Sequence, residues 1–227
     1  MSTPRNLLIF DMDGVLVDVT ASYRRTVIET VKHFTGAEIT NQDIQARKNR
    51  GGANNDWDLA LEMIRERAVP PTREEVIAVF QRIYLGGNCS GLIREERWLA
   101  GNGLLPRLAQ RWRLALFTGR ERWEALHTLG RFGAQNLFDP VIGMEDVVRE
   151  KPDPDGLFRI LRPMEPCKAY YIGDTMDDCR AARCAAVPFI GVAGPENPLR
   201  EELRGSFEQE GALAVISDLN ELERTLP

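Results

Sequence analysis

Length, composition and charge limit what this chain of 227 residues can be. Its content of 43% hydrophobic and 28% charged residues is ordinary for a globular protein, and the length suffices for one large domain or for a domain with a smaller companion. The formal net charge is -5, and no stripe of lysine and arginine alternates with aromatic residues, which argues against a nucleic-acid partner.

The cysteines, histidines and apolar runs narrow the class further. The four cysteines lack the spacing of a zinc site, and two histidines argue against a histidine-rich metal centre or a Ser-His-Asp triad. No apolar stretch approaches the roughly 20 residues that cross a bilayer. The first apolar run contains two aspartates, unlike a secretory signal. We therefore expect a reduced, soluble, cytoplasmic protein with no membrane partner, either a monomer or a homodimer.

The first expected element is a strand over Leu7–Phe10, which is short, β-prone and apolar on both faces. It ends at Asp11, with Asp13 and Gly14 directly behind, and the carboxyl ends of strands are where open α/β sheets bind ligands. Because burying an unpaired charge is costly, two aspartates at this point favour a functional role over packing. A strand end followed by an Asx-type turn is the simpler alternative.

The segment 19–90 is expected to be almost entirely helical. Apolar residues recur at helical spacing after Tyr23, and Gly36 is a plausible end of that first helix. Thr72 and Glu75 have the spacing of a capping box, which opens the last helix of the segment. The four helices are expected at about 23–35, 41–48, 56–68 and 73–85.

The remainder of the chain alternates short apolar runs with helical stretches. Strands that alternate with helices imply a parallel sheet covered on both faces. The expected fold class is therefore α/β: a Rossmann-like parallel sheet flanked by helices, with a helical-bundle cap domain inserted after the first strand. The core would comprise residues 1–18 and 91–227 and the cap residues 19–90, with hinges near 17–20 and 90–94. The expected strands are 114–117, 141–143, 169–172, 189–192 and 214–216, and the clearest helices are 121–132 and 176–186.

Polar residues of complementary chemistry follow several of these strands. Because the carboxyl ends of parallel strands share one edge of the sheet, their side chains should converge. Carboxylates suit Mg²⁺, which takes oxygen ligands, whereas a hydroxyl, a backbone amide and an ammonium group suit a phosphate. The set therefore predicts Mg²⁺-assisted phosphoryl transfer. Its members are Asp11, Asp13, Thr118, Gly119, Lys151, Asp174, Asp177 and Asp178.

In this order and at these positions, the residues resemble the four signature motifs of the haloacid dehalogenase-like hydrolase superfamily. The helical insert between the first and second motifs is similar to the α-helical cap of the phosphoglycolate phosphatase and β-phosphoglucomutase branch. The resemblance covers residues 6 to about 192. The motifs are Asp11-Met12-Asp13-Gly14-Val15-Leu16, Thr118-Gly119, Lys151-Pro152 and Gly173-Asp174-Thr175-Met176-Asp177-Asp178.

The resemblance implies a role for each motif residue. Asp11 would be the nucleophile that forms an aspartyl-phosphate, and Asp13 would protonate the leaving oxygen and then activate water. Lys151 would neutralise the charge between nucleophile and phosphate. The residues expected to hold the phosphoryl group are Gly14, Thr118, Gly119 and Lys151.

The same resemblance implies a Mg²⁺ site formed by the Asp11 carboxylate, the Asp13 backbone carbonyl and the Asp174 carboxylate. Asp178 would be an outer or water-mediated ligand, and a capping or supporting role on the following helix is its alternative. For Asp177 we expect a solvated carboxylate at the start of that helix, favoured by the helix dipole.

Two residues depart from the family's pattern. Gly119-Arg120 follows Thr118, where asparagine or lysine is common directly after the Ser or Thr of relatives. Arg120 could reach a substrate carboxylate or a second phosphate, or it could be an exposed arginine at the start of the next helix. Ala186 stands where relatives usually have the glycine that ends the fourth-motif helix, which would mildly strain the helix end.

Substrate choice is expected to lie in the insert, in the segment 48–55. It combines two cations, two glycines and amide side chains between two helices, and such a segment faces the active site in capped relatives. We predict that Lys48 or Arg50 contacts an anionic end of the substrate. The alternative is a solvated linker in which Asn54 or Asn55 caps the next helix.

The predicted function is Mg²⁺-dependent hydrolysis of a phosphomonoester, with a small phosphorylated metabolite as substrate. A phosphomutase is the main alternative, because the two activities share the same core. A dehalogenase is disfavoured, since that branch resembles a pattern that lacks the second aspartate, here Asp13. A non-catalytic phosphate-binding protein is disfavoured because every charged group of the motifs is present.

Overall fold

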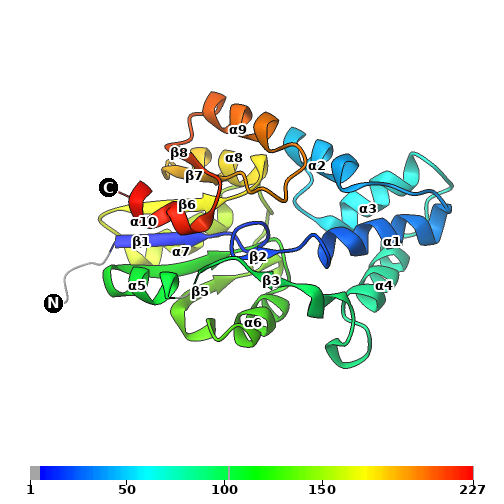
Figure 1. The fold of residues 1–227 in the computed structure, drawn as a ribbon, viewed down its shortest axis with the longest axis horizontal. Coiled ribbons are helices and arrows are strands. Elements are labelled where there is room, and N and C mark those ends of the chain that lie inside the picture. Colours follow the sequence, from blue (N-terminus) through cyan, green and yellow to red (C-terminus); the bar gives the residue numbers. More distant parts are fainter. Residues whose placement is uncertain (1–5, 102, 227) are drawn as a thin grey trace.

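A computed structural model describes residues 6–101 and 103–226. Within these ranges a six-stranded sheet runs through one half of the molecule in the order β5-β4-β1-β6-β7-β8 (Figure 1). Every neighbouring pair in this sheet is parallel, which confirms the expected α/β class. The strands are β1 (Asn6–Phe10), β4 (Trp112–Phe117), β5 (Phe138–Ile142), β6 (Ala169–Gly173), β7 (Phe189–Val192) and β8 (Ala214–Ile216).

The first strand lies at the centre of the sheet, between β4 and β6. Leu8 and Phe10 pack into the apolar layer on one face, and Leu7 and Ile9 pack into the layer on the other. All four side chains are completely buried, which explains why this strand is apolar at every position rather than at alternate ones.

Helices cover both faces of the sheet. One layer contains α7 (Asp155–Met164), α8 (Met176–Cys184) and α9 (Arg200–Gln209), and the other contains α5 (Leu104–Arg111), α6 (Arg122–Arg131) and α10 (Leu222–Thr225). The expected helices at 121–132 and 176–186 are present as α6 and α8. The helices α5, α7, α9 and α10 were not identified from the sequence.

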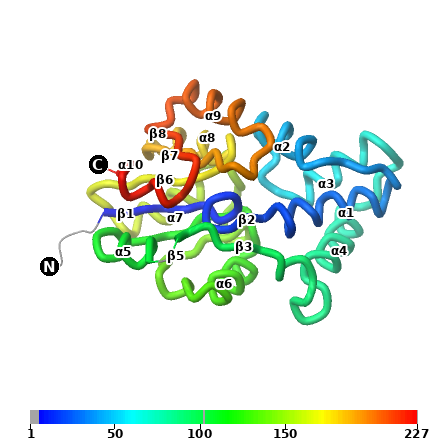
Figure 2. The backbone as a smooth tube through the Cα atoms, viewed as in Figure 1, coloured from blue at the N-terminus to red at the C-terminus, as the bar shows by residue number. Residues whose placement is uncertain are grey.

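The insert forms a separate group of helices beyond the carboxyl ends of the strands, and the tube in Figure 2 shows the chain leaving for it after β2 and returning before β3. The first of these helices packs against the third and fourth, and the expected Thr72–Glu75 capping box is present. Gly36 ends the first helix in a left-handed conformation, with φ of 69°. The helices are α1 (Tyr23–Thr35), α2 (Asn41–Arg50), α3 (Asp56–Arg65) and α4 (Arg73–Tyr84).

Two short strands join this group of helices to the core. β2 (Val17–Asp18) and β3 (Arg97–Trp98) pair antiparallel, and the Asp18 carboxylate accepts hydrogen bonds from the Arg97 guanidinium and from the Thr20 amide. The division into 1–18 with 91–227 and 19–90 stays a prediction, and its residues 1–5, 102 and 227 lie outside the described ranges. Among the helices of the described residues, none combines the length and the apolar character needed to cross a bilayer.

The end of α8 shows the strain expected from the sequence. Ala186 adopts a positive φ of 54°, a conformation that costs a residue with a Cβ about 1–2 kcal/mol. The amides of Ala186 and Val187 donate to the carbonyls of Arg183 and Ala182 at 3.1 and 2.9 Å, the bonding pattern of a Schellman motif. Alanine therefore occupies the position that this motif usually gives to glycine.

Candidate active site

Adjacent strand ends bring the predicted residues together. Asp11 directly follows β1, Thr118 follows β4 and Asp174 follows β6, and these three strands are neighbours in the sheet. A cavity lies over this edge, and the insert contributes part of its wall. The lining residues are Asp11, Asp13, Gly119, Arg120, Glu121, Met144, Asp174 and Thr175, with Val19, Tyr23, Arg24, Lys48, Asn54, Asn55, Asp56 and Trp57 from the insert.

Lys151 joins two carboxylates at the floor of the site. Its Nζ lies 2.9 Å from Asp11 Oδ1 and 2.8 Å from Asp178 Oδ1, and it donates to the Tyr171 hydroxyl at 3.3 Å. Burial alone would lower the pKa of Lys151, but Asp11 and Asp178 raise it well above its ordinary value. The lysine is therefore a permanent positive charge beside the expected nucleophile.

The negative charge of the carboxylates around Lys151 exceeds the single positive charge of this lysine. Burial raises the pKa of Asp11 to about 7, with Asp178 and Asp13 adding to the shift and Lys151 opposing it. Burial also raises the pKa of Asp174 well above its ordinary value, and Asp11 and Asp178 add to that shift. Crowded carboxylates with raised pKa values mark a place where a further cation would be bound.

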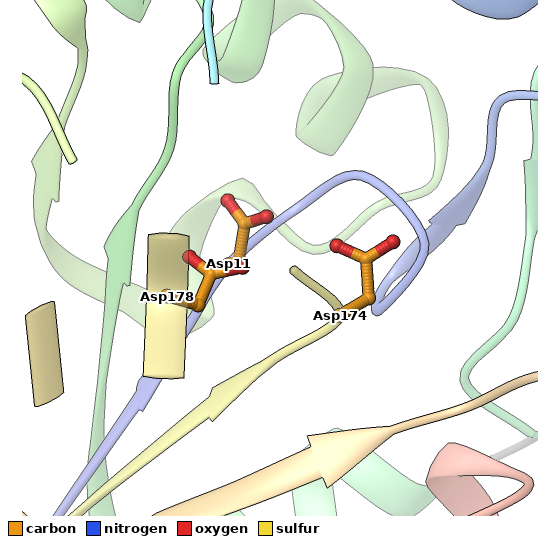
Figure 3. Close-up of side chains that lie close together, drawn as sticks. All are labelled: Asp11, Asp174 and Asp178. Atoms are coloured by element: carbon orange, nitrogen blue, oxygen red, sulfur yellow. The ribbon is translucent and has the colours of Figure 1, made fainter. Parts of the chain in front are cut away.

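Three of these carboxylates are arranged as ligands of a hard cation. Single oxygens of Asp11, Asp174 and Asp178 all lie within 4.8 Å of one another (Figure 3). Asp174 Oδ1 is buried and makes no hydrogen bond, as expected of an atom whose partner is a metal ion. Oxygen donors in such an arrangement fit Mg²⁺.

Gly14 makes the close approach of Asp174 possible. Its φ is 70°, and a Cβ at this position would lie 1.9 Å from Asp174 Oδ2. The amide of Gly14 donates to the Val17 carbonyl at 2.8 Å, so it is not free for a phosphate. The geometry therefore does not support the expected phosphate contact from Gly14 and gives this glycine a role in the turn instead.

Asp178 is held by the protein on both of its oxygens. Oδ2 accepts from the amide and hydroxyl of Thr175 at 3.0 and 2.6 Å, and Oδ1 accepts from Tyr171 at 2.6 Å as well as from Lys151. This capping-box geometry is the alternative considered for Asp178. The carboxylate fixes Lys151 and the start of α8, whatever part it takes in metal binding.

The second motif forms a tight turn after β4. The Thr118 amide donates to the Ile142 carbonyl at 3.0 Å, and its hydroxyl accepts from the Arg120 amide at 3.2 Å. A Cβ on Gly119 would lie 3.0 Å from the Asn54 side chain of the insert. Thr118 and Gly119 thus lie at the strand end where the resemblance places them, directly beneath the insert.

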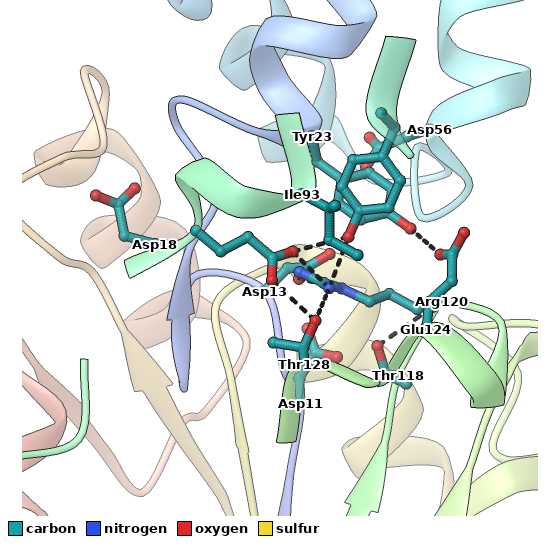
Figure 4. Close-up of polar contacts among 12 residues, drawn as sticks. Asp11, Asp13, Asp18, Tyr23, Asp56, Ile93, Thr118, Arg120, Glu124 and Thr128 are labelled. Atoms are coloured by element: carbon teal, nitrogen blue, oxygen red, sulfur yellow. Dashed lines mark hydrogen bonds and ion pairs between the residues drawn. The ribbon is translucent and has the colours of Figure 1, made fainter. Parts of the chain in front are cut away.

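Arg120 is not an exposed helix-start residue. Its side chain is 1% exposed and forms ion pairs with Asp13 Oδ1 at 2.5 Å and with Glu96 Oε1 at 2.7 Å (Figure 4). The exposed alternative was wrong because the turn between β4 and α6 directs this residue inward, against the general acid–base candidate Asp13. A substrate contact from Arg120 stays a prediction, and its protein partners already use most of its donors.

The two predicted cations of the insert differ in position. Lys48 lines the cavity and forms an ion pair with Asp56 at 2.9 Å. Arg50 is exposed and outside the cavity lining, and its carbonyl accepts a hydrogen bond from Arg180 at 3.1 Å. Lys48 is therefore the better placed of the two for an anionic substrate group.

The segment 48–55 is attached to the core rather than solvated. Asn55 caps α3, as in the alternative considered for this segment, and the side chains of Asn54 and Asn55 donate to Glu150 at 3.2 Å. The Asp177 carboxylate accepts from the amides of Gly52 at 2.7 Å and Ala53 at 3.1 Å. The expectation of a solvated Asp177 was wrong, because this segment covers the residue and leaves it 1% exposed.

Arg24 is a cavity residue that sequence reasoning missed. It extends from the first turn of α1 into the cavity wall, and its Nη2 donates to Gln45 at 2.6 Å, while its Nη1 is buried without a hydrogen-bond partner. A cation in the first turn of a helix opposes the helix dipole, and this unfavourable placement is the signal that could have found it.

Comparison with known proteins agrees with this geometry. Residues 6–186 match the model of the haloacid dehalogenase-like hydrolase family. The chain belongs to this family. A solved haloacid dehalogenase-like protein from Agrobacterium tumefaciens superposes with a TM-score of 0.72 at 19% identity, covering 96% of each chain, so it shares the fold.

Two curated relatives cover the chain at higher identity. A protein of Phytophthora nicotianae named imidazoleglycerol-phosphate dehydratase is 36% identical over all of this chain, which spans 54% of that protein's length. A phosphoglycolate phosphatase of Pseudomonas putida is 25% identical, over 95% of this chain and 78% of its own. The family predicted from the four motifs is confirmed.

Proposed function

We propose that this protein is a Mg²⁺-dependent phosphomonoester hydrolase that acts on a small phosphorylated metabolite through an aspartyl-phosphate. The observation that carries the proposal is the position of Asp11, whose carboxylate lies 2.9 Å from Lys151 within the acidic cluster. Such a carboxylate can approach a phosphate only where cations offset the repulsion between the two anions.

In the first step an oxygen of Asp11 attacks phosphorus, and the bond from phosphorus to the leaving oxygen breaks. Asp13 gives its proton to that oxygen, so the alcohol leaves as a neutral molecule. Lys151 and the turn at Thr118 and Gly119 hold the phosphoryl group. Mg²⁺, bound by Asp11, the Asp13 carbonyl and Asp174, would supply the Lewis-acid charge that screens the phosphate oxygens.

In the second step water replaces the Asp11 oxygen at phosphorus. Asp13 now takes the proton from the attacking water, and inorganic phosphate leaves with Asp11 restored. Asp13 suits both duties because its side chain is 25% exposed and faces the cavity, whereas Asp11 and Lys151 are almost fully buried.

The insert is proposed to select the substrate. Lys48 and Arg24 extend into the cavity wall from two of its helices, so a leaving group that carries a second anionic group would be favoured. 2-Phosphoglycolate, with its carboxylate, has this chemistry and fits the name of the Pseudomonas relative. An imidazole-bearing phosphate ester is a second substrate class to test, because of the name of the Phytophthora relative.

Phosphate release tests the proposal directly. The purified protein is assayed with p-nitrophenyl phosphate, 2-phosphoglycolate, imidazoleglycerol phosphate and inorganic pyrophosphate, each with Mg²⁺ and with EDTA. We expect Mg²⁺-dependent release from at least one monoester, and its absence from every compound would overturn the proposal. Interconversion of glucose phosphate isomers without net phosphate release would instead show a phosphomutase.

A further inference from the structure

Among the described residues, Arg120 has the largest of the almost fully buried side chains, and it lies directly against Asp13. Its Nε donates to Asp13 Oδ1 at 2.7 Å and its Nη2 lies 2.5 Å from the same oxygen. One charge-assisted hydrogen bond and one ion-pair contact on the same oxygen hold the carboxylate in this orientation. Oδ2 is then the oxygen that can reach a leaving group or a water molecule in the cavity.

The other side of the guanidinium is held equally firmly. Nη1 lies 2.7 Å from Glu96 Oε1 and donates to the hydroxyls of Tyr84 at 3.0 Å and Thr128 at 3.2 Å. Glu96 is completely buried in its side chain and accepts from the same two hydroxyls, each at 2.8 Å. Arg120 therefore has a fixed position that does not depend on substrate.

Part of this support comes from the insert. The Tyr23 ring of α1 lies 4.7 Å from the Arg120 guanidinium carbon, and its hydroxyl donates to Glu124 of α6 (Figure 4). Tyr84 belongs to α4, and its ring centroid is 4.2 Å from that of Tyr23. Two helices of the insert thus touch the residue that orients Asp13, so the position of the insert and that of Asp13 are mechanically linked.

We propose that Arg120 is a positioning residue that holds Asp13 in its catalytic orientation and connects that orientation to Tyr23 and Tyr84 of the insert. The inference rests on the proposed function, because it assigns to Arg120 an effect through the acid–base role of Asp13. Substrate binding by Arg120 is the competing interpretation, and the two differ in what the loss of the guanidinium changes.

A double-mutant cycle with two leaving groups separates them. Arg120→Met, Asp13→Asn and the double variant are assayed with p-nitrophenyl phosphate and with phenyl phosphate, whose leaving group is more basic and needs the acid more. We expect Arg120→Met to lower kcat/KM on the order of 10²-fold for phenyl phosphate and about 10-fold for p-nitrophenyl phosphate, because this constant reports the step in which the leaving group departs. The value of kcat should fall as well, because Asp13 acts in both steps. In the Asp13→Asn background the further loss should be under about 3-fold.

Additive losses, or equal losses for both substrates, would overturn the inference. A raised KM with unchanged kcat would show substrate binding instead. Arg122→Met is the matched control, since Arg122 lies two positions further along the chain, in the first turn of α6, and its side chain is half exposed. Arg120→Lys keeps the charge opposite Glu96 and should fold normally, yet lose part of kcat because its single ammonium cannot make both contacts.

A structural measurement keeps the inference separate from the proposed activity. In a crystal structure of the Arg120→Lys protein, or of Arg120→Met combined with Glu96→Gln, the Asp13 carboxylate should have left its position in the unsubstituted protein. An unchanged Asp13 side chain would overturn the inference even in an active enzyme. If the unsubstituted protein released no phosphate, the proposed function would be overturned. The position of the Asp13 carboxylate in the variant structure would still decide whether Arg120 orients it.

Discussion

The edge of the sheet and the segment 48–55 of the insert form opposite walls of one cavity and are built differently. At the sheet edge, Lys151 and Asp178 form a buried ion pair with each other, Lys151 also pairs with Asp11, and Asp178 accepts from Tyr171 and Thr175. The segment 48–55 is attached to the core mainly by hydrogen bonds from backbone and side-chain amides of the segment to the carboxylates of Asp177 and Glu150.

This difference in attachment assigns the reaction to the sheet edge and the choice of substrate to the segment 48–55. Charges buried at fixed distances cannot move without a large loss of free energy, so the reacting groups keep their geometry. Hydrogen bonds to a charged group contribute about 1.5–3 kcal/mol each, less than the roughly 3–5 kcal/mol lost when a buried ion pair is broken. The few that hold the segment 48–55 can therefore be broken when substrate enters. We expect changes at the sheet edge to act on kcat and changes in the segment to act on KM.

The largest effect is expected at the nucleophile. Asp11→Asn should lower phosphate release at least about 10³-fold, because the amide cannot form the acyl phosphate. Folding should persist, since Lys151 keeps its ion pair with Asp178. Rapid-quench detection of phosphorylated protein should also fail in this variant. The exposed Glu208→Gln serves as control, and labelled phosphate on the Asp11→Asn protein would contradict the assignment.

Lys151→Met is expected to affect both rate and stability. Loss of one electrostatic donor should lower kcat about 10²–10³-fold. Leaving buried carboxylates without their cation should lower the free energy of unfolding by about 3–5 kcal/mol. Urea unfolding and steady-state kinetics measure the two effects, with the exposed Lys168→Met as control. If Lys151→Met raised only KM, it would contradict the expectation that changes at the sheet edge act on kcat.

Mg²⁺ should stabilise the protein in a pH-dependent manner. In the metal-free protein the pKa of Asp11 is about 7, so between its usual value of 3.8 and pH 7 the folded state holds a proton that the unfolded chain releases. This group therefore lowers stability as pH rises through that window and has no further effect above it.

Because Mg²⁺ competes with the protons on Asp11 and Asp174, whose pKa values are both raised, its stabilising effect should grow as the pH rises from 5 through 7. At 100 times its dissociation constant it should add about 2.7 kcal/mol. Thermal unfolding with MgCl₂, compared with NaCl of equal ionic strength, provides the measurement. An equal Mg²⁺ effect at pH 5 and pH 8 would contradict the assigned site.

Asp177→Ala tests the other wall. It removes the carboxylate that accepts from the Gly52 and Ala53 amides, so the segment 48–55 should close less tightly over the core. We expect KM to rise about 10-fold, equivalent to about 1.4 kcal/mol, with kcat within a factor of about two. Asp139→Ala, on the exposed side of β5, is the control, and a large fall in kcat alone would assign Asp177 to the chemistry.

The smallest effect is expected far from both walls. Ala186→Gly should raise the free energy of unfolding by about 1 kcal/mol, because glycine adopts the positive φ of this position without strain. Kinetic constants should not change. Ala185→Gly is the matched control, since its φ is -85° and glycine there should destabilise the helix end. Stabilisation by both variants would contradict the explanation from the left-handed conformation.

The sheet edge could be predicted from the sequence because its information is local. Each strand is an apolar run, and each catalytic candidate follows such a run directly, as Asp11 and Asp174 do. The helix α7 was missed since it follows two prolines and contains Pro163, which obscures the helical pattern.

Contacts between distant residues could not be predicted in the same way. Whether Arg120 is exposed depends on Glu96 and Tyr84, and whether Asp177 is solvated depends on Gly52, which lies 125 residues away. The periodicity of apolar residues along the sequence does not indicate which distant residues are in contact. The same limit applied to Arg50, whose residue type suited a substrate contact but whose helix directs it outward.

The pairing of β2 with β3 has a consequence for how such proteins diversify. Val17 opposes Trp98 and Asp18 opposes Arg97, so the two ends of the long excursion between β1 and β4 are fixed side by side. The entropy of closing a loop grows only slowly with its length. An insertion of another size could therefore replace this one with little effect on the sheet, and new substrate ranges could evolve by exchange of the insert while the reaction stays the same.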